Sequence, residues 1–105
     1  MTSVKFLADS KGLYGFEISG HSSVDCEDEV GKTVCAAVSS TVWMTINGIE
    51  KQNLARLSYE ERDGFVDCIV EEKFSDSADV LLNSLVMFIA ELSGQYKEFL
   101  KLSEE

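Results

Sequence analysis

The chain has 105 residues, of which 45% are hydrophobic and 27% are charged, and its formal net charge is −10 at pH 7. This length and composition are typical of one globular domain, residues 1–105, with a single core. The charge argues against direct binding to nucleic acid or anionic lipid, because their phosphates would repel the protein, and it suits a basic partner.

Neither a secretory signal nor a membrane span is expected. The N-terminus lacks a basic segment followed by an apolar run, and no apolar run approaches the roughly 20 residues that a span needs. Three cysteines without a CxxC pair argue against a disulfide framework. We therefore expect a cytoplasmic protein in a reducing compartment.

The first two predicted elements are strands. Residues 4–9 (VKFLAD) alternate between apolar and polar side chains, and residues 13–19 (LYGFEIS) do the same. The turn sequence SKG between them predicts a hairpin. The second strand ends at Gly20, immediately before His21, the only histidine of the chain.

A helix is predicted from Thr33 to about Lys51, because the apolar residues step by three or four. Thr33 is the expected N-cap, which puts Cys35 in the first turn. Ser39 lies one turn further along the same side as Cys35. The apolar stripe consists of Val34, Val38, Val42, Ile46 and Ile49.

The second half of the chain repeats this order. Residues 55–59 and 66–70 alternate, and the sequence RDGF between them predicts an Asp-Gly hairpin turn. The sequence SDSAD then predicts a helix start, with Ser75 or Ser77 as the N-cap and Asp79 near the positive end of the helix dipole. The stripe of this helix is expected to comprise Leu81, Leu85, Phe88, Leu92, Tyr96 and Phe99.

The predicted element order is β-β-α-β-β-α. Short hairpin turns build an antiparallel sheet, and two amphipathic helices need a surface to cover. We therefore expect a two-layer α+β fold, with a four-stranded antiparallel sheet and both helices on one face. The pattern leaves the strand order open. A homodimer, formed by edge pairing or helix contact, is one way to protect the sheet edges.

Cys35 has the predicted position of a reactive thiol. The positive end of a helix stabilises a thiolate, and N–H groups there can hold an oxyanion. His21, at the end of a strand, could serve as its general base. The alternative is ordinary packing, since buried cysteines are common and Ala36 and Ala37 suggest close contact. Spacing alone leaves both interpretations open.

The other cysteines are weaker candidates. Cys26 lies in the acidic run DCEDE, where negative charge opposes thiolate formation. Cys68 alternates with valines of a predicted strand and is expected in the core. The spacing His21-x4-Cys26-x8-Cys35 matches no zinc pattern. We therefore expect no metal and no other cofactor.

The segment from Gly20 to Ser39 resembles a motif of the ribosomal-processing cysteine protease family of bacteria (Prp). In that family a Gly-His pair ends a strand, and a Gly-x-Asp-x-Val-Cys-Ala-Ala-x-Ser segment opens a helix. Length and element order are similar over the whole chain. The matching residues are Gly20, His21, Val34, Cys35, Ala36, Ala37 and Ser39, and Gly31 lies one position from the glycine of the motif.

The resemblance implies a homodimeric cysteine endopeptidase that removes the N-terminal extension of large-subunit ribosomal protein twenty-seven. Cys35 would be the nucleophile and His21 the general base, and Gly20, Ser39 and Ala36 would contact the substrate. The substrate would be a basic ribosomal protein, which the acidic surface would attract.

One position departs from the family motif. Lys32 stands where the family usually has aspartate, three residues before the cysteine. Lysine cannot accept a hydrogen bond from the imidazole, so the residue that orients His21 stays open among Asp25, Asp28 and Glu29.

Two other functions stay open from the sequence. The chain could be a non-catalytic acidic binding module of ribosome assembly, or a redox-sensing thiol protein that uses Cys35 and Cys26. A protease thiol should be alkylated quickly, a packed thiol slowly, and a redox pair should form a disulfide under mild oxidation.

Overall fold

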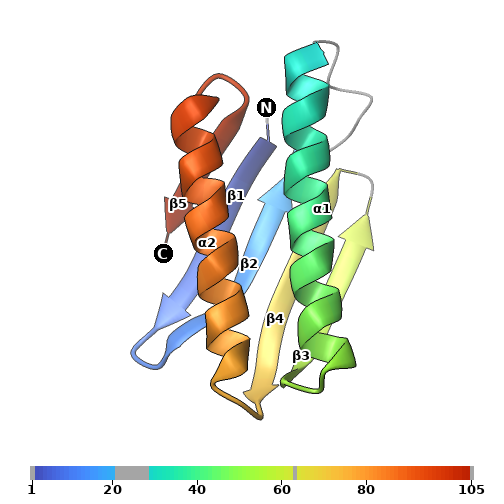
Figure 1. The fold of residues 1–105 in the computed structure, drawn as a ribbon, viewed down its shortest axis with the longest axis vertical. Helices are drawn as coiled ribbons and strands as arrows, with labels where there is room; N and C mark the ends of the chain where they lie inside the picture. Colours follow the sequence, from blue (N-terminus) through green and yellow to red (C-terminus); the bar gives the residue numbers. More distant parts are fainter. Residues whose placement is uncertain (1, 21–28, 63, 105) are drawn as a thin grey trace.

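The structure is a computed structural model, and it describes residues 2–20, 29–62 and 64–104. Both helices cover the same face of the sheet, as the sequence predicted (Figure 1). The α+β class and the two layers are therefore confirmed. The elements are β1 (Thr2–Asp9), β2 (Gly12–Ser19), α1 (Glu29–Lys51), β3 (Ala55–Arg62), β4 (Phe65–Lys73), α2 (Ser77–Gln95) and β5 (Leu100–Glu104).

The sheet differs from the prediction in strand number and direction. The described residues form a five-stranded sheet in the order β3-β4-β2-β1-β5, and β5 runs parallel to β1. The predicted four-stranded antiparallel sheet is wrong because α2 ends at Gln95, so Phe99 lies beyond the helix. Leu100 and Leu102 then pack on the core from β5, on either side of the exposed Lys101.

Both predicted hairpins are present. β1 and β2 pair antiparallel, with Phe6 opposite Phe16 and their ring centroids 6.3 Å apart in an edge-to-face contact. β3 and β4 also pair antiparallel. Gly64, immediately before β4, has a φ of 75°, which glycine adopts without steric cost. Asp63, the other residue of the predicted turn, lies outside the described residues.

The core lies between the helices and the sheet. The predicted stripe of α1 is confirmed, because each of its five apolar side chains is at most 2% exposed. The inner face of α2 is offset from its predicted stripe, and Phe88 is 37% exposed. The buried residues of α2 are Ala78, Leu82, Leu85 and Ile89.

Helix α1 begins at Glu29, four residues before the predicted start. Thr33 is therefore not the N-cap, and its hydroxyl donates to the Glu29 carbonyl at 3.0 Å inside the helix. Glu29 favours this start because its charge lies at the positive end of the helix dipole. Gly31 and the acidic run before it had indicated a loop. Cys35 is the seventh residue of the helix rather than a first-turn residue.

Helix α2 begins where the sequence predicted, but with a different cap. Asp76 is the N-cap and makes no side-chain capping bond. Ser75 instead accepts a hydrogen bond from the Ser77 N–H at 3.1 Å. Asp79 lies in the first turn as predicted, and it also pairs with Lys73 Nζ at 2.6 Å.

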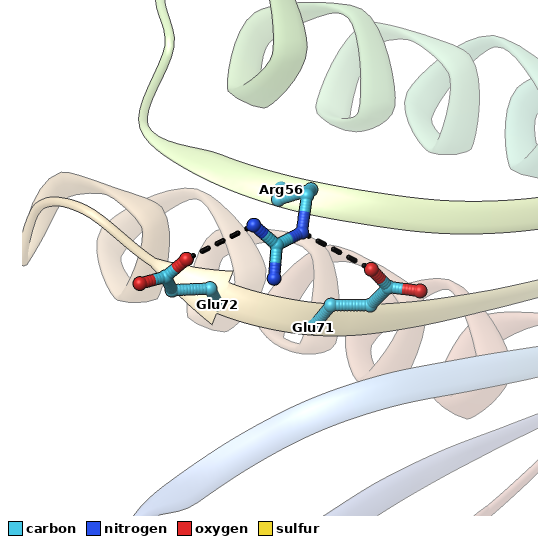
Figure 2. A network of polar contacts seen from close by, with 3 residues as sticks. All are labelled: Arg56, Glu71 and Glu72. Atoms are coloured by element: carbon cyan, nitrogen blue, oxygen red, sulfur yellow. Dashed lines mark hydrogen bonds and ion pairs between the residues drawn. The ribbon is translucent and has the colours of Figure 1, made fainter.

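Strand β3 forms one edge of the sheet and carries exposed charged side chains. Figure 2 shows Arg56 of this strand between Glu71 and Glu72 of β4, with nitrogen–oxygen distances of 3.1 Å to both. Exposed ion pairs of this kind contribute little stability. Charge on an edge strand does, however, discourage pairing with another sheet.

Helix α2 is long and apolar enough to cross a membrane by length and composition alone. Its 19 residues include an 18-residue window of mean hydropathy 1.3, of which 22% is buried. The sequence pattern had predicted no membrane span. A single helix of this kind is weak evidence for a span, because the core helix of a soluble protein passes the same test.

Candidate active site

Cys35 lies on the sheet-facing side of α1 and is 8% exposed. Its sulfur is 3.3 Å from the hydroxyl oxygen of Thr2, the first residue of β1. The N–H groups without an intrahelical acceptor belong to the first turn of a helix, and Cys35 follows that turn. The N–H groups of the first turn therefore do not stabilise a Cys35 thiolate in the way that the sequence predicted.

Strand β2, which precedes His21 in the chain, ends close to the contact between Cys35 and Thr2. Ser19, the last residue of β2, pairs with Ser3 of β1, and Ser3 follows Thr2. Gly20 continues the chain with a φ of 68°, a backbone conformation that favours glycine. The described residue before His21 thus lies at the same end of the sheet as Cys35. His21 itself, Cys26, Asp25 and Asp28 lie outside the described residues.

The predicted substrate-contacting residues lie around the same end of the fold. Gly20 and Ala36 are exposed, and Ser39 is half-buried one turn after Cys35. Ala36 follows Cys35 directly, so its side chain points about 100° away from that of Cys35 around the helix axis. The substrate-contacting role of all three residues stays a prediction.

A hollow of about 220 Å³ lies between α1 and α2, beside the part of α1 that carries Cys35. Leu92 and Tyr96 were predicted in the packing stripe of the second helix, and their position facing α1 could not be predicted from periodicity. Val34 and Ala37, on either side of Cys35 in the chain, contribute to the same hollow. Its lining residues are Val30, Thr33, Val34, Ala37, Leu92 and Tyr96.

Cys68 is a core residue, as predicted from its strand pattern, and it is 1% exposed. Burial, and secondarily the Glu50 carboxylate, raises the pKa of its thiol to about 12. Cys68 is therefore a poor nucleophile near neutral pH. Among the described residues, no group of three or more histidine, cysteine or acidic side chains is arranged to hold a metal ion.

Lys32, the departure from the family motif, points into solvent. Its ammonium lies 3.9 Å from the Glu29 carboxylate, and the two side chains are 52% and 93% exposed. Glu29 is the described member of the three predicted acceptors for His21, and its carboxylate pairs here with Lys32. The residue that orients the imidazole stays open.

The fold and the position of Cys35 agree with a family match. The family model described as cysteine protease Prp matches residues 1–101. The chain belongs to this family of cysteine proteases. The Prp match covers nearly the whole chain and includes both Cys35 and His21. Comparison with curated proteins gives no significant match.

Solved structures share this Prp fold. The essential ribosomal processing protease Prp from S. aureus, in complex with a substrate peptide, is similar with a TM-score of 0.88 and 19% identity over 100% of both chains. The same protease with a covalently linked product peptide gives a TM-score of 0.86 and 19% identity, again over 100% of both chains. SMU.848 from Streptococcus mutans gives a TM-score of 0.78 and 22% identity, over 100% of this chain and 96% of that one.

Proposed function

We propose that this chain is a cysteine endopeptidase that removes an N-terminal extension from a ribosomal protein. The family match over residues 1–101 carries this proposal. Two features of the structure support it: Cys35 packs against the start of β1, and β2 ends beside that start. Both residues of the Cys35–His21 pair would then come from segments that meet at one end of the sheet.

The proposed mechanism uses Cys35 as nucleophile and His21 as general base. The thiolate attacks the scissile carbonyl, the peptide C–N bond breaks, and the imidazolium of His21 protonates the leaving amine. His21 then takes a proton from water, which hydrolyses the thioester and restores the thiol.

The decisive experiment is incubation with N-terminally extended ribosomal protein twenty-seven. We expect Cys35→Ala to abolish cleavage and His21→Gln to slow it by about 10²–10⁴-fold, as for the loss of a general base. Cys26→Ser is the matched control, because it removes a thiol from the same region of the sequence, and it should cleave normally. Cleavage by Cys35→Ala at the unmodified rate would show that the nucleophile is assigned wrongly.

We also propose that the protein is a homodimer, as the family resemblance implies. The outer side of α2 supports this, since Val80 and Met87 are 64% and 70% exposed and lie two turns apart. Sedimentation should give twice the chain mass of 11.6 kDa. Met87→Glu should shift the mass toward the monomer, and a monomeric unmodified protein at micromolar concentration would refute the dimer.

A cytoplasmic location is part of the proposal, because three cysteines without a disulfide framework suit a reducing compartment. Cell fractionation with antibodies against the untagged protein tests it. Recovery from the extracellular fraction would contradict it.

A further inference from the structure

Thr2 is a buried polar residue at the start of a core strand. It is 1% exposed and shares the helix-facing side of β1 with Val4 and Phe6. Its backbone is held at the start of β5, because Thr2 pairs with Leu100 and the Thr2 N–H donates to the carbonyl of the preceding Phe99 at 3.0 Å. The strand pairing thus fixes where the Thr2 hydroxyl points.

The hydroxyl oxygen of Thr2 lies 3.3 Å from Cys35 Sγ, within hydrogen-bonding range for sulfur. Either group can donate while Cys35 is a thiol. A thiolate can only accept, so once the proton leaves Cys35 the Thr2 hydroxyl becomes the donor. Hydrogen bonds to a charged acceptor are roughly twice as strong as neutral ones. The contact therefore strengthens as the nucleophile forms.

We propose that Thr2 is a positioning residue for Cys35: its hydroxyl holds the sulfur on the β1 side of α1 and donates to the thiolate. This inference rests on the proposed function of Cys35 as the nucleophile. The position of Cys35 gives this hydroxyl its importance. Cys35 lies beyond the first turn of α1 and is 8% exposed, so neither the first-turn N–H groups nor bulk water would stabilise its thiolate well. A thiolate that is so buried requires a hydrogen-bond donor close by.

Two variants of Thr2 test the proposal. Thr2→Val keeps the shape and removes the hydroxyl, whereas Thr2→Ser keeps the hydroxyl. Thr45→Val is the matched control, because Thr45 is also buried in the core, at 4% exposure, and its hydroxyl donates within α1 to the Thr41 carbonyl. Melting curves verify that each variant is folded.

The first measurement is the rate of Cys35 alkylation by iodoacetamide as a function of pH, followed by mass spectrometry. Thr2→Val should slow alkylation at neutral pH by about tenfold or more, the effect of losing a hydrogen bond to a charged group. Its rate profile should also move to higher pH than that of the unmodified protein. Thr2→Ser should restore most of the rate, and Thr45→Val should match the unmodified protein.

The second measurement is peptide cleavage. Thr2→Val should lower kcat by a similar factor with little change in KM, since the hydroxyl acts on the nucleophile and not on substrate binding. If valine prevents folding, Thr2→Ala also removes the hydroxyl and carries the same expectation.

An unchanged alkylation profile in Thr2→Val would overturn the proposal. Equal slowing in Thr2→Val and Thr2→Ser would also overturn it, because packing rather than the hydroxyl would then be responsible. Persistent cleavage by Cys35→Ala would refute the proposed function instead. The alkylation test would still report on the Thr2–Cys35 contact in that case.

Discussion

Cys35 and Cys68 are both buried thiols, but their surroundings differ. Cys35 contacts a hydroxyl on β1, whereas Cys68 faces the core at 1% exposure and its pKa is raised to about 12. At pH 8 only about one Cys68 thiol in ten thousand would be ionised. We expect iodoacetamide to label Cys35 and leave Cys68 unmodified in the native protein. Peptide mapping by mass spectrometry measures both sites in one sample.

Unfolding provides the control for this labelling. In concentrated urea, Cys68 should react as fast as an ordinary cysteine, because its pKa is raised only by folded surroundings. If Cys68 is labelled as quickly as Cys35 in the native protein, the burial of the Cys68 side chain on the inner face of β4 is wrong.

The sequence predicted single residues well where their role follows from a local pattern. The core position of Cys68 follows from the alternation in β4. The contact between Thr2 and Cys35 could not be predicted, because it joins residues 33 positions apart across two elements. The position of Cys35 relative to the helix start was misjudged for a local reason: the acidic run that precedes Gly31 resembles a loop.

Strand β4 carries a carboxylate in an unfavourable place. Asp67 lies between Glu17 of β2 and Glu60 of β3, which are its direct partners in the sheet. Its Oδ1 atom is buried and accepts no hydrogen bond from the described residues. Burial, followed by the Glu17 charge, raises the pKa of Asp67, and Arg62 opposes this.

We expect Asp67→Asn to stabilise the protein at pH 7. A raised pKa means that the folded state binds more protons than the unfolded chain, so stability falls as pH rises through the folded pKa. Asparagine removes that loss, and the gain should be about 0.5–1 kcal/mol, the size of one or two cross-strand charge pairs. Urea unfolding at pH 7 measures it.

The gain from Asp67→Asn should disappear at about pH 3, where the carboxyl is protonated in both states. Glu91→Gln, on the exposed surface of α2, serves as the control for removing one negative charge. A stabilisation of the same size in both variants would point to net charge rather than to crowding in the sheet.

Strand β5 is short but contributes to the core. Leu100 is 1% exposed, so Leu100→Ala should lower the free energy of unfolding by about 2–5 kcal/mol through the cavity it leaves. The neighbouring Lys101 is exposed, and Lys101→Ala should change stability by less than about 0.5 kcal/mol. Chemical denaturation of the two variants compares them. Equal, small effects would show that β5 does not close the core.

The helices and hairpins could be predicted because each has a periodic pattern of its own. The fifth strand could not, because Phe99 continues the spacing of the α2 stripe and hides the helix end at Gln95. Strand order was also beyond the sequence, since pairing of β2 with β4 and of β1 with β5 depends on contacts between distant segments. The family motif identified the candidate pair, and the structure describes Cys35 of that pair.

The net charge of −10 acts on the molecule as a whole. A basic substrate should be attracted at long range, and salt should weaken this attraction because the Debye length shortens. We expect kcat/KM for a basic peptide to fall severalfold between about 50 and 200 mM salt, with kcat unchanged. A peptide in which the lysines are replaced by glutamines is the control. An equal salt response of both peptides would exclude electrostatic attraction.

The position of β1 between β2 and β5 has a consequence for the timing of folding. β1 pairs early with β2 through a short hairpin, but its other neighbour is β5, which follows α2 in the chain. Long-range pairings of this kind form slowly, and a ribosome releases the N-terminal segments first. The carbonyl of Phe99, which accepts a hydrogen bond from the Thr2 N–H, is therefore absent until the segment that follows α2 has been synthesised. A nascent chain that lacks this segment would carry Cys35 beside an incomplete sheet, so we expect the proposed nucleophile to mature only after β5 has emerged.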